Sequence, residues 1–110
     1  MEALLLLTTG NHANTHIPEI IGNARGFELT GNATDHAIVS NFFDIVTANH
    51  TFATGGSNDY EHWGPPRRLG DQLNDQTEES CTQYNILKVP ALPATVCACV
   101  RVSLSAAECC

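Results

Sequence analysis

The fold is indicated by residues 17–48, which read IPEIIGNARGFELTGNATDHAIVSNFFDIVTA. Apolar residues recur in the first half of this stretch at the spacing of one helical face, and the same period returns after the central Gly-Asn pair. We therefore predict helices over residues 17–30 and 33–48. The link between them is short, so the two helices should pair as an antiparallel hairpin.

The ends of the first predicted helix have recognisable signals. Thr15 or His16 is placed to cap its start, Pro18 suits a first helical turn, and Gly31 is a suitable stop. Its apolar face contains five residues: Ile17, Ile20, Ile21, Ala24 and Phe27.

The second predicted helix has a broader apolar face. Asn32 or Thr34 is placed to cap it, and Asp35 is favourable in its first turn. The face contains Ala37, Ile38, Phe42, Ile45 and Val46, and it is widened by Val39 and Phe43. Such breadth indicates a helix that is buried on more than one side.

A long loop over residues 50–74 should follow. Loops of this length in compact domains are usually functional. A third helix is predicted over residues 77–89, with Asp75 or Thr77 as its cap and two glutamates in its first turn. Residues 90–110 are expected to form an irregular tail.

Composition restricts the possible partners and location. The chain has 110 residues, room for one small domain, and a net charge of −7. This acidic balance argues against nucleic-acid and membrane-surface partners. No stretch is long enough to span a membrane. The apolar run near the N-terminus lacks the basic flank of a signal peptide, which slightly favours a cytoplasmic location.

Five cysteines are present, four of them in the last 14 residues. An odd number is unusual for a closed set of disulfides, and reduced thiols or metal ligands are favoured in the absence of a signal peptide. The tail carries Cys97, Cys99, Cys109 and Cys110.

Three clusters of polar residues could carry chemistry. They cover residues 11–16, 54–63 and 78–85. Taken singly, each has a simpler explanation as a helix cap, a turn or a first-turn charge. Taken together they suit sugar chemistry: a carboxylate on a loop, Trp63 and Tyr60 to stack on a sugar face, and His and Asn side chains for hydroxyl groups.

In this order, the clusters resemble glycoside hydrolase family 127, typified by β-L-arabinofuranosidases. The resemblance covers residues 10–89 and is closest to plant or algal members. Its motifs are His12-Ala13-Asn14-Thr15-His16-Ile17-Pro18, Ala53-Thr54-Gly55-Gly56, Glu61-His62, and Glu79-Ser80-Cys81 followed by Tyr84-Asn85 and Leu87-Lys88.

This resemblance implies a mainly α fold, in which the predicted helices form a partial arc of an (α/α)6 barrel. It also implies retaining hydrolysis of non-reducing β-L-arabinofuranosides by a cysteine nucleophile held on Zn²⁺, which one glutamate and three cysteines bind. Glu61 falls on the general acid/base and His12 on a sugar-contacting histidine. Glu79 and Cys81 fall on two of the metal ligands. Because residues two apart point to different sides of a regular helix, we expect a distorted or just-forming first turn there.

The family's other two zinc cysteines are adjacent and lie much further along the chain. Cys109-Cys110 stands in an unrelated context, so we do not assign that pair to the zinc. We expect a truncated piece of the catalytic domain over residues 10–89, inactive alone, with an unmatched tail. Two alternatives remain at this point: a small zinc-binding or interaction protein that uses the cysteine-rich tail, and a non-catalytic helical scaffold.

Overall fold

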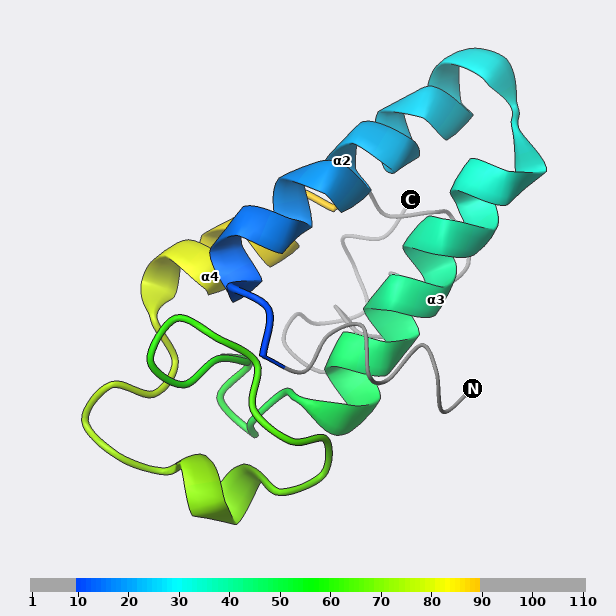
Figure 1. Ribbon diagram of the computed structural model, residues 1–110. Coiled ribbons are helices and arrows are strands. Elements are labelled where there is room, and N and C mark those ends of the chain that lie inside the picture. The colour runs from blue at the N-terminus through cyan, green and yellow to red at the C-terminus, as the bar shows by residue number, and fades with distance from the viewer. Residues whose placement is uncertain (1–9, 90–110) are drawn as a thin grey trace, which may run out of the picture.

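The computed structural model describes residues 10–89. The chain over this range is mainly helical, as predicted, and extended pairing within it is limited to isolated bridges. Its helices are α2 (Ala13–Thr30), α3 (Ala33–Asn49), the short 3-10 helix η1 (Leu69–Gln72) and α4 (Ser80–Ile86) (Figure 1). Our expectations for the N-terminal apolar run, the tail and its four cysteines lie outside the described residues.

Helices α2 and α3 form the predicted antiparallel hairpin (Figure 1). Gly31 ends α2 in the left-handed region with φ 69°, and its N–H donates to the carbonyl of Phe27 at 2.8 Å. The Asn32 side chain then accepts from the N–H of Thr34 at 2.9 Å and caps α3. A residue with a Cβ is disfavoured at the φ of Gly31, so the sequence signal for this turn has a direct structural basis.

Helix α2 begins at Ala13, four residues before the predicted start. Its cap is His12, whose Nδ1 accepts from the N–H of Thr15 at 3.2 Å. Histidine is not among the common cap residues, which is why the prediction favoured Thr15 or His16. Pro18 consequently lies inside the helix and not in its first turn.

Helix α4 is shorter than the predicted span of 77–89. Thr77 does not cap it, because its hydroxyl donates to the carbonyl of Gln72 at 2.5 Å and accepts from the N–H of Asn74 at 3.0 Å. Glu79 occupies the cap position without a capping side-chain bond. The last predicted turn is present only as turn hydrogen bonds, such as that from the N–H of Val89 to the carbonyl of Ile86 at 3.1 Å.

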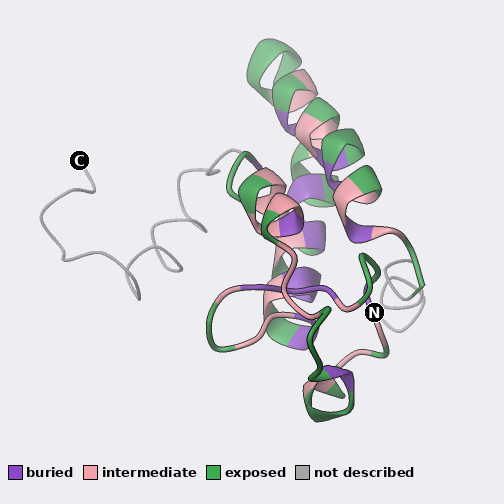
Figure 2. Ribbon diagram, turned by 90° about the vertical axis from the view of Figure 1, so that its left-hand side faces the viewer, coloured by how far each residue is buried: buried purple, intermediate pink, exposed green. Residues whose placement is uncertain are grey.

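The core lies between the facing sides of the helices and also includes Trp63 from the loop and Val89, which lies beyond the end of α4. Figure 2 shows buried positions on these facing sides and along part of the loop. Ile38 is 40% exposed and Ala37 is also exposed. These two residues were predicted to lie in the core, but they do not belong to the buried face of α3. The buried hydrophobic cluster contains Ala13, Ile17, Ile20, Ala24, Val39, Phe42, Val46, Trp63 and Val89.

The long loop folds back onto both helices instead of projecting from them. The backbone N–H of Arg67 donates to the carbonyl of Asn49 at 2.7 Å, and the Arg67 Nε donates to the Asn49 side chain at 2.8 Å. The indole N–H of Trp63 donates to the hydroxyl of Ser57 at 3.3 Å. These contacts tie the loop to the C-terminal end of α3 and to itself. Among the described residues, no helix has both the length and the apolar character needed to cross a membrane.

The burial of His50 predicts a pH-dependent stability. Its ring lies 6.1 Å from the ring of Trp63, and burial lowers its pKa below the ordinary value. The unfolded chain therefore takes up a proton at a higher pH than the folded chain does. Stability from this group is complete above about pH 6.5 and is lost as the pH falls toward the folded-state pKa.

We expect urea unfolding to give a lower free energy of unfolding at pH 5.5 than at pH 7.5. The His50→Gln variant should show a flatter dependence over this range, whereas His36→Gln, at an exposed position, should keep the slope of the parent chain. Equal slopes for the parent and His50→Gln would contradict this assignment.

Candidate functional site

The first part of the site forms where the loop meets the start of α2. The N–H of Ala13 donates to the carbonyl of Glu61 at 2.8 Å, and that of Gly10 donates to the carbonyl of Trp63 at 2.7 Å. An isolated antiparallel bridge joins His12 to His62. These backbone bonds bring the first and second sequence clusters together.

His12 and Glu61 face each other across this junction. The His12 Nε2 lies 3.5 Å from the Glu61 Oε2, and their side chains are 36% and 58% exposed. Because Nδ1 of His12 accepts the cap bond from Thr15, the neutral ring carries its proton on Nε2. The histidine therefore presents a donor N–H to the carboxylate, and the carboxylate remains open to a ligand.

Glu61 stands on a tight two-residue turn. Asp59 and His62 exchange two backbone hydrogen bonds, each of 2.9 Å, and the residues between them have positive φ: 45° at Tyr60 and 65° at Glu61. Positive φ at two successive non-glycine residues is unfavourable, and such strain is concentrated at functional sites. This turn was not predictable from local residue types, because hairpin turns of this kind usually carry Asn-Gly or Asp-Gly.

Tyr60→Asn should relieve part of this strain. Asparagine tolerates the left-handed region better than tyrosine, and the Tyr60 side chain is 62% exposed and contributes little packing. We expect the free energy of unfolding in urea to rise by about 1 kcal/mol. Tyr60→Ala, which gains no such tolerance, is the control. An asparagine variant no more stable than the alanine variant would show that the turn is unstrained.

The second part of the site lies at the start of α4. Glu79 has an extended backbone, with φ −56° and ψ 130°, and Cys81 is the second residue of the helix. Glu79 and Cys81 therefore lie where the helix is just forming, as expected. Burial, together with the hydrogen bond and negative charge of Glu79, raises the pKa of the Cys81 thiol. The negative charge of Glu79 thus acts on the thiol two residues further along the chain.

This pair has the chemistry of two zinc ligands. Zn²⁺ accepts carboxylate oxygen and thiolate together. The Glu79 Oε2 is buried and has no hydrogen-bond partner, which leaves an oxygen available beside the thiol. No group of three or more His, Cys, Asp or Glu side chains able to hold a metal occurs within residues 10–89. The structure thus brings His12 to Glu61 and Glu79 to Cys81, without joining the two pairs into one such group.

Comparison with known proteins agrees with this pattern of residues. The model of the β-L-arabinofuranosidase family, described as the GH127 catalytic domain, matches residues 8–91. Neither curated proteins nor solved structures gave a match. The chain belongs to glycoside hydrolase family 127.

A glycoside hydrolase acts on carbohydrate, but Trp63 is not available to stack on a sugar here. It is fully buried, with its ring 5.5 Å from the rings of both Phe42 and His16. That sequence-based expectation is wrong because the loop folds inward and uses its largest apolar side chain as an anchor. Tyr60 is the exposed aromatic residue beside Glu61.

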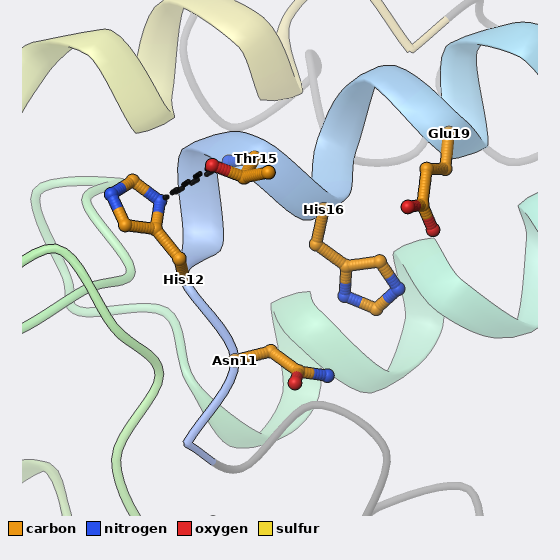
Figure 3. A pocket seen from close by; sticks show the side chains of 5 residues that line it. All are labelled: Asn11, His12, Thr15, His16 and Glu19. Atoms are coloured by element: carbon orange, nitrogen blue, oxygen red, sulfur yellow. Dashed lines mark hydrogen bonds between the residues drawn. The ribbon is translucent and has the colours of Figure 1, made fainter.

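An open pocket of about 220 Å³ lies beside the start of α2. Its lining consists of Asn11, His12, Thr15, His16 and Glu19 (Figure 3). In Figure 3 the His12 ring turns toward Thr15, whereas Asn11 and His16 lie on the side that faces α3. In this family-127 chain, four residues of the first sequence cluster therefore line one pocket. Glu19 was not among the site residues predicted from the sequence. The only signal that could have indicated it is its position one helical turn after His16.

Proposed function

We propose that this chain carries the acid/base side of the active site of a retaining β-L-arabinofuranosidase-like enzyme. Glu61 is the general acid/base and His12 is a contact to the sugar. The observation that supports this most strongly is the 3.5 Å approach of His12 Nε2 to Glu61 Oε2, between segments far apart in the sequence. Family membership supplies the class of substrate.

In this proposal Glu61 protonates the leaving oxygen and later takes a proton from water. The exposure of its carboxylate leaves room for a glycosidic oxygen at that position. His12 keeps a donor N–H toward the same space, because its other ring nitrogen is used by the helix cap. A donor in this place is suited to a sugar hydroxyl group as well as to the carboxylate.

We propose Glu79 and Cys81 as two of the residues that hold Zn²⁺. When bound, zinc keeps thiolates deprotonated near neutral pH, which supplies the cysteine nucleophile implied by the family resemblance. Within this chain, the role of Glu79 is to offer an unpaired oxygen beside the Cys81 sulfur. Cys81 falls on a ligand and not on the nucleophile.

Sugar binding tests the assignment of His12 and Glu61. Methyl β-L-arabinofuranoside titrated into the ¹⁵N-labelled chain should shift the backbone resonances of both residues at millimolar concentration. The resonances of Leu29, at the far end of α2, should stay unchanged. Glu61→Gln should weaken binding. Shifts spread evenly over the chain, or none at His12 and Glu61, would contradict the assignment.

We also expect no turnover from the 110-residue chain with added zinc. A retaining glycosidase needs its acid/base and nucleophile about 5 Å apart. The matched region supplies an acid/base without a matched nucleophile, and small misplacements already cost about a hundredfold in rate. Release of the aryl group from an aryl β-L-arabinofuranoside should equal that in buffer. Turnover abolished by both Glu61→Gln and Cys110→Ser would overturn this expectation and assign the nucleophile to the terminal cysteine pair.

A further inference from the structure

We infer that His62 is a second sugar-binding side chain of the site, and that its Nε2 accepts a hydrogen bond from one hydroxyl group of the sugar. His62 follows Glu61 directly in the sequence, but the proposed function gives it no role. The inference rests on the proposed function, because it requires a sugar bound at Glu61.

The proton of the neutral His62 ring is held on Nδ1. This nitrogen lies 2.7 Å from the carbonyl oxygen of Tyr60. A carbonyl oxygen can only accept, so Nδ1 is the donor, and Nε2 of the neutral ring can then only accept. Within residues 10–89 the bond to Tyr60 is the only hydrogen bond of the His62 ring, and the residue is exposed. Nε2 is therefore available to a ligand as an acceptor.

The turn that carries Glu61 is also what fixes this proton. Asp59 and His62 close the turn with two backbone hydrogen bonds of 2.9 Å, and Tyr60 lies inside it with φ 45°. The carbonyl that binds the His62 ring thus belongs to the same strained turn as the proposed acid/base. One backbone conformation places the carboxylate and sets the tautomer of the next side chain.

His12 and His62 form a pair with opposite hydrogen-bonding character. An antiparallel bridge joins them, and their ring centroids are 5.2 Å apart with an interplanar angle of 66°. Nδ1 of His12 accepts from the N–H of Thr15, so its Nε2 donates, whereas Nε2 of His62 accepts.

This pairing favours a ligand that has several hydroxyl groups. A hydroxyl group can donate and accept, so neighbouring hydroxyl groups of one sugar can satisfy both rings. A carboxylate only accepts and an ammonium group only donates, so neither could satisfy the two rings together. The pair therefore adds a preference for a sugar at the proposed site.

The test is a double-mutant cycle between this side chain and the sugar, measured by resonance shifts of the ¹⁵N-labelled full chain. His62→Asn is the variant, because its amide N–H can still donate to the Tyr60 carbonyl but it has no group at the position of Nε2. His36→Asn, at an exposed position on α3, is the matched control. The ligands are methyl β-L-arabinofuranoside and its three analogues that carry fluorine in place of one hydroxyl group, since fluorine cannot donate a hydrogen bond.

We expect His62→Asn to weaken binding of the unmodified sugar by roughly threefold to tenfold, the usual effect of one hydrogen bond. One fluorinated analogue should bind the parent chain more weakly by a similar factor, and His62→Asn should weaken its binding no further. His36→Asn should bind all four ligands as the parent chain does. Ring ¹⁵N spectra of the sugar-free parent chain at about pH 8, where an ordinary imidazole is neutral, should place the His62 proton on Nδ1.

Three results would overturn the inference and leave the proposed function standing. They are a His62 proton on Nε2, equal affinity of His62→Asn and the parent chain for the unmodified sugar, and an equal loss for all four ligands in His62→Asn. The last of these would reflect a general change in the turn and not the loss of one hydroxyl contact. If the parent chain binds none of the four ligands, the proposed function falls and the inference falls with it.

Discussion

Replacing Trp63 with alanine should lower the free energy of unfolding by about 3–5 kcal/mol, the usual cost of truncating a large buried aromatic side chain. Trp63 is fully buried and touches the rings of Phe42 and His16, which come from the two helices of the hairpin. A loss of this size is a large share of the stability of a small domain. Because Trp63 is the only tryptophan, helical circular dichroism in urea is the suitable probe.

Trp63→Phe keeps most of the apolar volume and should cost clearly less than the alanine variant. Leu29→Ala, at an exposed position, should change stability by no more than about 0.5 kcal/mol. If Trp63→Ala were as mild as Leu29→Ala, the tryptophan would not anchor the loop, and the sugar-stacking role inferred from the sequence would return to consideration.

Replacing Glu79 with alanine should remove zinc protection of Cys81. The carboxylate supplies the second of the two ligands proposed in this chain, and its Oε2 has no other hydrogen-bond partner. Changes to groups that merely orient a ligand cost ten- to a hundredfold in affinity, so loss of the ligand itself should cost at least as much. The measurement is the zinc concentration that half-protects Cys81 from iodoacetamide.

Asp44→Ala is the matched control, because it removes one negative charge from an exposed position on α3. It should leave zinc protection of Cys81 unchanged. If the two variants weakened protection equally, the effect of Glu79 would be a general one of net charge and not ligation.

The helical hairpin was predictable because its signals are local. Three signals predicted it, and each acts within a few residues: the helical period of the apolar side chains, the stop at Gly31 and the cap at Asn32. The structure has the helix end and the helix start where these signals predicted them. The predicted start of α2 was wrong because His12 caps the helix through a ring nitrogen, which is a rare use of that side chain. The early end of α4 and the shifted inner face of α3 depend on contacts between elements, which no local pattern specifies.

The pairing within the site was less accessible to sequence reasoning. The family resemblance supplied the candidate residues, but the approach of His12 to Glu61 depends on a turn without the usual Asn-Gly signal. The contact of Thr54 with Glu78 joins distant parts of the chain and has no sequence signature. The prediction that Trp63 stacks on a sugar was wrong because an aromatic residue in a polar loop is equally compatible with ligand stacking and with burial in the core.

The two nitrogens of the His12 ring have a thermodynamic consequence. One nitrogen closes the first turn of α2 and the other faces the Glu61 carboxylate, so fraying of that turn and loss of the carboxylate contact are linked events. A ligand that binds at Glu61 through His12 favours the closed helix end by as much as it prefers that state over the frayed one. By the same linkage, a weakened first turn lowers the affinity for that ligand even when no contacting residue is changed.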